Sequence, residues 1–246
     1  MPDPTPDPSA VKVETPYVAT IDWAQFWATA EDNDREGANP SAMHADAALA
    51  SFIEETSVTG AIADVGCGAG VAAFHIAERF PGRVVVGYDA AEPVLDENRM
   101  KARADGVDNV RFERAVLPSF DPDRRFGVVF SYFTLCYVRD VEAALRNLYD
   151  AVEPGGYLVF NYQNRYARAH WRELAEAPEE YIDQESAFDP DRFAERFATL
   201  LEGDSVLSYR RIQEVLGAWP QSVWTVVERP DKQWAWRHHP LVYVPK

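Results

Sequence analysis

Residues 64–70 read Asp-Val-Gly-Cys-Gly-Ala-Gly, and this glycine-rich stretch is the most informative part of the sequence about the fold. It follows the short apolar run Ala61–Val65 and precedes the amphipathic run Val71–Arg79. Glycines between a strand and a helix let the chain turn tightly and let a ligand lie against the backbone and the first amides of the helix. The stretch therefore predicts a strand, a ligand-binding loop and a helix in succession.

Further short apolar runs alternate with longer amphipathic runs on the C-terminal side of this loop. The strands that we expect are Ala61–Val65, Val84–Tyr88, Val110–Glu113, Val128–Tyr132 and Tyr157–Tyr162. The helices that we expect between them are Val71–Arg79, Ala91–Ala104 and Val141–Ala151, the last closed by a turn at Glu153–Gly156. Strands joined by helical crossovers require an α/β fold with a doubly wound, mostly parallel sheet.

The segments on either side of this core have different patterns. Residues 1–16 are rich in Pro and Asp and predict a flexible tail, and residues 17–58 predict an N-terminal lid and a first helix over 41–55. Residues 59–164 are the predicted core. After this core, strand and helix patterns no longer alternate over residues 165–205, which we interpret as a helical cap. Residues 206–246 predict a helix over Ser208–Leu216 and an antiparallel hairpin of Ser222–Val227 and Leu241–Val244, all within a single domain.

Composition excludes several classes of function. The 246 residues include 40 acidic and 24 basic side chains, for a formal charge of −16, so we expect no nucleic-acid or membrane-surface partner. Two cysteines, Cys67 and Cys136, cannot make a disulfide framework or a four-cysteine zinc site, and we expect no metal. No signal peptide is recognisable and no apolar run reaches the ~20 residues of a membrane helix. We expect a cytoplasmic protein.

The charge around the glycine loop indicates which cofactor it binds. Asp89 ends the second predicted strand, where a carboxylate can accept hydrogen bonds from both ribose hydroxyls, so the loop predicts a nucleoside cofactor. A dinucleotide site usually reads Gly-x-Gly-x-x-Gly, whereas this loop reads Gly-x-Gly-x-Gly directly after Asp64. The acid opposes a pyrophosphate and favours a cation. S-adenosylmethionine carries an ammonium and a sulfonium and no phosphate.

At these residues the sequence resembles the class I S-adenosylmethionine-dependent methyltransferases, in their small-molecule, UbiE-like branch (methyltransferase type 11). Phe126–Val138 is similar to the family's fourth strand and its exit, and Leu148–Leu158 to the approach to its fifth strand. The resemblance implies a seven-stranded Rossmann-like sheet with a C-terminal antiparallel hairpin and a helical cap. It also implies a set of cofactor-binding positions: Asp64, Gly66, Cys67, Gly68, Gly70, Asp89, Ala90, Ala115, Val116, Ser131 and Phe133.

Two departures from the family pattern stand out. The family often has an acid after the third strand for the adenine amine, but here Phe112–Pro118 has none at that place, so we expect backbone groups near Ala115 and Val116 to hold adenine. The family's acid at the start of the fourth strand is also replaced, because Gly127 stands between Phe126 and Val128.

Methyl transfer requires alignment and exclusion of water, and it requires a base only for some acceptors. The catalytic residues therefore stay unknown, with Tyr137, His44 and His170 as weak candidates. Residues in the lid, in the cap and after the fourth and fifth strands are the expected acceptor-binding positions, although packing explains them equally: Trp23, Trp27, Tyr132, Cys136, Tyr137, Asn161, Tyr162 and Trp171.

The function that we expect is methyl transfer from S-adenosylmethionine to a small-molecule acceptor by in-line displacement, by a monomer or homodimer. Two alternatives stay open: an oxidoreductase that uses a nicotinamide dinucleotide, and a non-catalytic module that binds the cofactor or a partner.

Overall fold

The computed structural model describes residues 21–38, 45–178, 192–227 and 240–246. Its centre is a seven-stranded sheet of order β3-β2-β1-β4-β5-β7-β6. The strands are β1 Ile62–Val65, β2 Val85–Asp89, β3 Val110–Arg114, β4 Phe126–Ser131, β5 Val152–Asn161, β6 Gln221–Ser222 and β7 Leu241–Pro245. The first five pair in parallel, and β7 runs antiparallel to both β5 and β6. The predicted doubly wound Rossmann-like sheet is confirmed.

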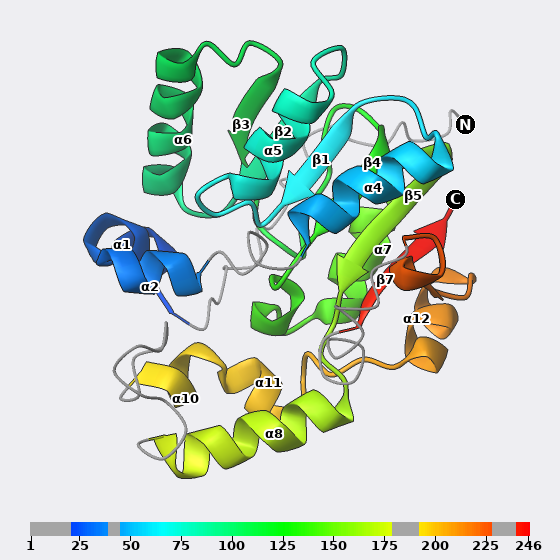
Figure 1. The fold of residues 1–246 in the computed structure, drawn as a ribbon. Coiled ribbons are helices and arrows are strands. Elements are labelled where there is room, and N and C mark those ends of the chain that lie inside the picture. Colours follow the sequence, from blue (N-terminus) through cyan, green and yellow to red (C-terminus); the bar gives the residue numbers. More distant parts are fainter. Residues whose placement is uncertain (1–20, 39–44, 179–191, 228–239) are drawn as a thin grey trace, which may run out of the picture.

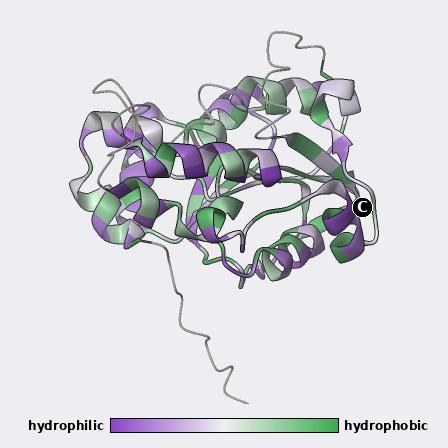
Figure 2. Ribbon diagram, turned by 90° about the horizontal axis from the view of Figure 1, so that it is seen from below, coloured by the Kyte–Doolittle hydropathy of each residue, from purple (hydrophilic) through white to green (hydrophobic). Residues whose placement is uncertain are grey.

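Helices cover both faces of the sheet (Figure 1). One face carries α4 Asp46–Thr56, α5 Val71–Arg79 and α6 Glu92–Asp105, and the other carries α7 Val141–Asp150 and α12 Tyr209–Leu216. Because both faces are covered, β1 and β4 are buried along their whole length, which explains why they read as unbroken apolar runs. Figure 2 shows hydrophobic colour along the inner strands and a mixture of hydrophobic and hydrophilic colour on the surrounding helices.

The lid and the cap lie at the same end of the sheet (Figure 1). The lid consists of α1 Trp23–Thr29 and α2 Asp32–Gly37, and the cap consists of α8 Arg165–Glu176, α10 Phe193–Arg196 and α11 Ala198–Glu202. A short 3-10 helix, η1 Leu135–Tyr137, follows β4 at this end. The carboxyl ends of parallel strands, where open α/β sheets bind their ligands, face the lid and the cap.

The lid contains a helix that the sequence analysis did not predict: α2, whose Arg35 donates a hydrogen bond to the Trp27 carbonyl at 2.8 Å. Two local predictions are wrong. The predicted turn at Glu153–Gly156 lies inside β5, at a register shift opposite Phe126 and Val128. The predicted strand Ser222–Val227 is only β6 followed by a 3-10 helix, η3 Val223–Thr225.

The spacing of two valines explains the last difference. Val223 and Val227 are both buried while Thr225 between them is exposed, which suits one face of a helical turn, because in a strand all three side chains would lie on the same face. The backbone amides of Val226 and Val227 both donate to the Val223 carbonyl. The chain therefore coils immediately after pairing with β7.

Gly127 is required by a close approach of two backbone segments. A Cβ atom at this position would lie 1.7 Å from the carbonyl oxygen of Thr59. The Gly127 amide also donates to the Ala61 carbonyl at 2.9 Å. The departure from the family pattern at this position therefore follows from the way β4 enters the sheet beside β1.

Candidate functional site

The glycine loop between β1 and α5 is held against the end of β2. The amides of Gly66 and Cys67 both donate to the Tyr88 carbonyl, at 2.7 and 2.9 Å. Gly66 has φ +80°, and a Cβ atom there would lie 2.1 Å from Thr134 Oγ1. Only glycine combines this left-handed conformation with so close a contact. The loop is therefore fixed between β2 on one side and the exit of β4 on the other.

Asp89 is the carboxylate that ties the loop to β2. Its Oδ2 accepts the Gly68 amide at 2.9 Å and its Oδ1 accepts the Ala91 amide at 3.0 Å. Asn98 adds a hydrogen bond from its Nδ2 to the Gly68 carbonyl at 2.7 Å. Burial raises the pKa of Asp89, and the hydrogen bonds from Ala91 and Gly68 oppose that rise. Since each carboxylate oxygen has a second lone pair, Asp89 can also accept hydrogen bonds from a ligand.

Asp64 lies beneath the loop. Its side chain is buried and its carboxylate accepts a hydrogen bond from the Ala73 amide, in the first turn of α5. Burial, together with the nearby charge of Asp89, raises the pKa of Asp64 to about 7. The two carboxylates therefore make the floor of the site acidic, and Asp64 changes its charge near neutral pH.

A cavity of about 1660 Å³ opens above the loop. It exceeds the ~300–1,000 Å³ of most small-molecule sites, because it extends along the connection between β3 and β4, which itself forms no helix. Instead, residues 115–125 run along the α7 face of the sheet, and the cavity continues beside them as far as Asn147 and Asp150. The volume is sufficient for a nucleoside cofactor together with a second small molecule.

The cavity borders many of the residues predicted from the sequence. Of the predicted cofactor-binding positions, it borders Gly66, Gly68, Asp89, Ala90, Ala115, Val116 and Phe133. Of the predicted acceptor-binding positions, it borders Trp23, Trp27, Tyr132 and Tyr137. Residues from the lid, the glycine loop, the exit of β3 and the exit of β4 thus meet around one space.

Other predicted cofactor positions are buried around the cavity without bordering it. Like Asp64, they support the loop: Cys67, Gly70 and Ser131. Ser131 Oγ donates to the Val65 carbonyl at 2.9 Å, and Gly70 has φ +73° at the start of α5. Burial and the charges of Asp89 and Asp64 raise the pKa of the Cys67 thiol. These residues shape the loop from below.

Four predicted acceptor positions also lie away from the cavity wall. Tyr162 packs on the α7 face, and Trp171 lies in the core of the cap, 4.1 Å from Phe197 between ring centroids. Burial raises the pKa of the Cys136 thiol. Asn161 lies behind Phe133, whose amide donates to its Oδ1 at 2.6 Å.

The two histidine candidates gain no support from the geometry. His170 is on the exposed side of α8 and does not border the cavity. His44 lies outside the described residues. Among the described residues, no three His, Cys, Asp or Glu side chains gather as they would around a metal ion, and no helix is both long and apolar enough to cross a bilayer.

Arg196 joins the lid, the cap and the exit of β4. Its guanidinium lies over the rings of Trp23 and Phe26, 5.6 and 5.3 Å from their centroids, and forms a hydrogen bond with Tyr137. The Trp23 ring meets the Tyr137 ring edge-on at 4.8 Å. Burial raises the pKa of Tyr137, while the Arg196 charge opposes the rise, so Tyr137 stays protonated at neutral pH. Sequence reasoning missed Arg196 because nothing local distinguishes it from other arginines in the cap.

Sequence reasoning also missed cavity residues on the two long connections. These include Thr134, Leu117, Pro118 and Arg139. They carry no motif, and only the packing of the connections against the sheet brings them to the cavity. Thr134 had a possible signal, because it follows the fourth predicted strand closely and lies where strand exits meet a ligand.

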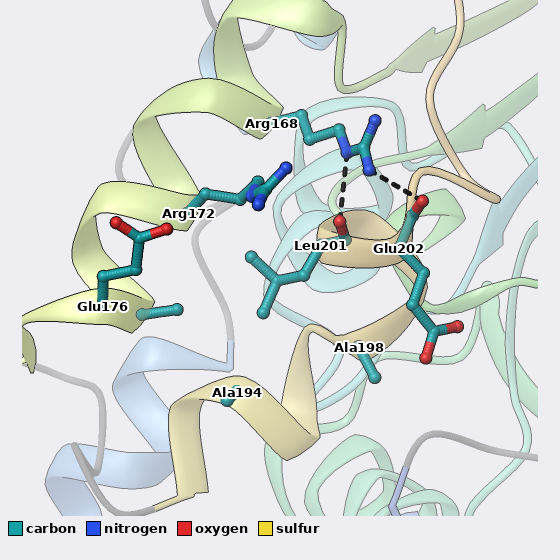
Figure 3. A pocket seen from close by; sticks show the side chains of 8 residues that line it. Arg168, Arg172, Glu176, Ala194, Ala198, Leu201 and Glu202 are labelled. Carbon is teal, nitrogen blue, oxygen red and sulfur yellow. Dashed lines mark hydrogen bonds between the residues drawn. The ribbon is translucent and has the colours of Figure 1, made fainter.

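A separate hollow of about 420 Å³ lies in the cap, between α8 and the α10–α11 pair (Figure 3). Arg168 on α8 donates from its Nε to the Leu201 carbonyl at 3.0 Å and from an Nη to the Glu202 carbonyl at 2.9 Å. These bonds satisfy carbonyls at the end of α11. The hollow is therefore a gap beside a structural contact that holds two helices of the cap together.

The fold belongs to the α/β domains that bind a nucleoside cofactor, as indicated by the sheet order, the glycine loop after β1 and the acid at the end of β2. Residues 62–156 match a family model described as a methyltransferase domain. Residues 62–156 thus form a methyltransferase domain, and the fold around them is that of the class I S-adenosylmethionine-dependent methyltransferases.

Named relatives agree with this assignment. The chain is 42% identical to a demethylmenaquinone methyltransferase of Thermus thermophilus over 40% of this chain and 44% of that protein. It is 28% identical to a trans-aconitate 2-methyltransferase of Deinococcus radiodurans over 64% of this chain and 57% of that protein. The matches thus span about half the length of these relatives. In fold, the chain is similar to the plantazolicin methyltransferase BpumL, solved in complex with SAH, with a TM-score of 0.59, 12% identity and coverage of 91% and 93% of the two chains.

Proposed function

We propose that this chain transfers a methyl group from S-adenosylmethionine to a small-molecule acceptor by in-line displacement. The observation that carries the proposal is the junction of two features at one cavity. The loop fixed by Asp89 forms its floor, and Trp23, Trp27 and Tyr137 form walls on the lid and after β4. A cavity with a cofactor-binding loop at its bottom and aromatic side chains around it suits a reaction from which water must be excluded.

The residues around the floor fit this cofactor. Asp89 would accept the ribose hydroxyls, and the backbone at Gly66 and Gly68 would contact the methionine part, where no side chain intervenes. Ala115 and Val116 offer an apolar edge with backbone groups for adenine. The buried carboxylates favour an ammonium group and oppose a pyrophosphate. Bound there, S-adenosylmethionine supplies an electrophilic methyl group on a positively charged sulfur.

The chain's own contribution is positioning and enclosure. The rings of Trp23 and Tyr137, packed edge-on and braced by Arg196, would hold a flat or apolar part of the acceptor and exclude water. The Tyr137 hydroxyl already pairs with Arg196 and Cys136, so Tyr137 would present its ring to the acceptor. A tyrosine with a raised pKa is a poor general base, so Tyr137 would position the acceptor, and the base, if the acceptor needs one, stays unassigned.

The names of the relatives support a small-molecule acceptor, because demethylmenaquinone and trans-aconitate are small molecules. We further propose that no nucleic acid or membrane is a partner, in line with the formal charge of −16. The cytoplasmic location and the monomeric or homodimeric state stay predictions.

Calorimetric titration tests the proposal first. We expect S-adenosylmethionine and S-adenosylhomocysteine to bind and nicotinamide dinucleotides not to bind. Tight binding of a nicotinamide dinucleotide without any response to S-adenosylmethionine would favour the oxidoreductase alternative.

A turnover screen then separates an enzyme from a binding module. The purified protein is incubated with methyl-labelled S-adenosylmethionine and extracts of small metabolites, and labelled products are identified by mass. We expect a labelled small molecule. A protein that binds the donor but labels nothing in metabolite, protein or nucleic-acid extracts would be a binding module.

A further inference from the structure

Five aromatic residues border the large cavity where the lid meets the exit of β4: Trp23, Trp27, Tyr132, Phe133 and Tyr137. We call them the aromatic wall. The hydroxyl groups of its two tyrosines differ in their partners. The Tyr137 hydroxyl pairs with Arg196 and Cys136. The Tyr132 hydroxyl has no hydrogen-bond partner among the residues that the structure describes.

The Tyr132 hydroxyl is accessible although most of its side chain is buried. The residue is 9% exposed, and its oxygen is not among the fully buried atoms that lack a partner. Since Tyr132 itself borders the cavity, this oxygen is open to a molecule bound there. Burial raises the pKa of Tyr132, so the hydroxyl keeps its proton at neutral pH. A hydroxyl that is mostly removed from water and has no protein partner is a donor available to a ligand.

The exit of β4 holds Tyr132 in one position. The Tyr132 ring stacks on that of Phe130, with 6.2 Å between the centroids and 12° between the planes. The next residue, Phe133, has φ +58°, a strained conformation for a residue with a side chain. Asn161 Oδ1 accepts the Phe133 amide at 2.6 Å and so stabilises this bend. Strain that the surroundings hold in place is typical of binding sites, and here it fixes the residue that follows Tyr132.

Two arginines packed on the aromatic wall disfavour a cationic ligand. Arg196 lies over Trp23 and Arg35 lies over Trp27, 5.6 and 5.2 Å from the ring centroids. Neither arginine borders the cavity. A ligand cation would be drawn to the same rings and would be repelled by the guanidinium that already occupies each of them.

An anionic ligand finds no counter-charge at the aromatic wall. The wall contains no basic side chain, and Arg139, which follows it in the chain, pairs with Glu202 and Asp204. The other described cations that border the cavity belong to β3, to the connection after it and to the C-terminus. Asp89 adds negative charge at the floor of the cavity. Burying an anion without a counter-charge is costly, so the wall suits an uncharged group.

We infer that Tyr132 determines specificity for the acceptor, because its hydroxyl donates a hydrogen bond to an uncharged oxygen of that molecule, such as a carbonyl. The inference rests on the proposed function. The cofactor contacts proposed above use Asp89 and the glycine loop, and they leave the Tyr132 hydroxyl to the acceptor.

The substitution Tyr132→Phe removes this hydroxyl and keeps the ring. Because no protein group loses a partner, the fold should keep its stability. Tyr209→Phe on α12 makes the same chemical change at a residue that does not border the cavity, and it is the matched control.

The experiment titrates small probes into the full chain saturated with S-adenosylhomocysteine and follows the proton NMR signals of each probe. Acetophenone carries an uncharged oxygen, and α-methylstyrene has the same shape with a methylene group in place of that oxygen. Benzoate and benzylammonium are the charged counterparts.

We expect Tyr132→Phe to bind acetophenone about three- to tenfold more weakly than the parent does, and to bind α-methylstyrene as the parent does. The parent should bind both charged probes more weakly than acetophenone. The Tm of Tyr132→Phe should stay within about 2 °C of the parent, and Tyr209→Phe should match the parent with every probe.

Four results would overturn the inference. The first is a parent that binds S-adenosylhomocysteine but not acetophenone. The second is a Tyr132→Phe variant that loses affinity for acetophenone and α-methylstyrene equally, or for neither. The third is a charged probe that binds the parent as tightly as acetophenone does. The fourth is weaker binding of S-adenosylhomocysteine by Tyr132→Phe, which would assign the hydroxyl to the cofactor. A parent that does not bind S-adenosylhomocysteine would instead overturn the proposed function.

Discussion

Replacing Asp89 by Asn removes one charge and one hydrogen-bond acceptor from the tie between β2 and the glycine loop. Both carboxylate oxygens accept backbone amides, from Gly68 and Ala91. Asparagine has one acceptor oxygen, so its amide group must face one of these two donors. We expect the local bond to Ala91 to survive and the bond to Gly68 to be lost, which loosens the loop where the cofactor would lie.

The magnitude follows from the bonds lost. Hydrogen bonds to a charged group contribute about 1.5–3 kcal/mol, so losing the proposed ribose contact weakens binding of S-adenosylhomocysteine by about 10- to 150-fold at ~1.4 kcal/mol per decade. Leaving the Gly68 amide unpaired costs about 1–3 kcal/mol of folding stability. In a domain of this size each kcal/mol lowers the Tm by about 2–4 °C.

Calorimetry with S-adenosylhomocysteine and a thermal melt measure the two effects on the same sample. Asp121→Asn is the matched control, because Asp121 borders the outer part of the cavity beside the 115–125 connection. We expect this control to bind S-adenosylhomocysteine as the parent does. A dissociation constant for Asp89→Asn within twofold of the parent would refute the assignment of Asp89 to the cofactor.

Four further predictions concern the charge of Asp64, the backbone of the glycine loop and the lid. The pKa of Asp64 is raised to about 7, and a bound cation favours the ionised form of this carboxyl. S-adenosylmethionine should therefore bind about tenfold more weakly at pH 6 than at pH 8. At pH 6, binding should release about one proton. Calorimetry in buffers of different ionisation enthalpy measures that proton, and Asp64→Asn should abolish it. The same raised pKa means that the folded protein holds the proton more tightly than the unfolded chain, so stability without ligand should fall as pH rises from about 4 to 7; a pH-independent melt in that window would contradict it. Gly66→Ala should abolish cofactor binding, since its Cβ would lie 2.1 Å from Thr134 Oγ1, whereas Gly82→Ala, whose Cβ meets nothing within 4 Å, should bind normally. Trp23→Ala should leave the affinity for S-adenosylhomocysteine within about tenfold of the parent, roughly 1.4 kcal/mol. The same variant should turn over the acceptor that the screen identifies more than tenfold more slowly than the parent. Turnover equal to that of the parent would show that Trp23 only packs against Tyr137 and Arg196.

The sequence predicted the elements whose cause is local. Helix α5 begins and ends where its amphipathic pattern does, at Val71 and Arg79. Strands β1 and β4 were recognisable because burial on both faces makes them continuously apolar. The glycine loop was recognisable because its conformation depends on residue type at single positions, as the φ values of Gly66 and Gly70 illustrate.

Local pattern failed where distant contacts decide conformation. The short helix α2 forms in a polar segment whose Arg35 pairs with Glu97 on α6 and with the Trp27 carbonyl. No pattern within residues 32–37 contains those partners. In the same way, the chain at Val223 coils because the packing of its side chain against the sheet competes with continued strand pairing.

The same distinction between local sequence and distant contacts applies to the candidate site. The sequence determined which residue types stand at the strand ends, and hence that an acid and a glycine loop would meet a nucleoside cofactor. Three contacts became visible only in the folded chain: Asp89 accepts the Gly68 amide, Asp64 lies beneath the loop, and Arg196 links Trp23 to Tyr137. The folded chain also shows that the carboxamides of Asn161 and Gln163 are buried with unpaired atoms. Motif and period depend on neighbours along the chain, whereas burial and hydrogen-bond partnership depend on neighbours in space.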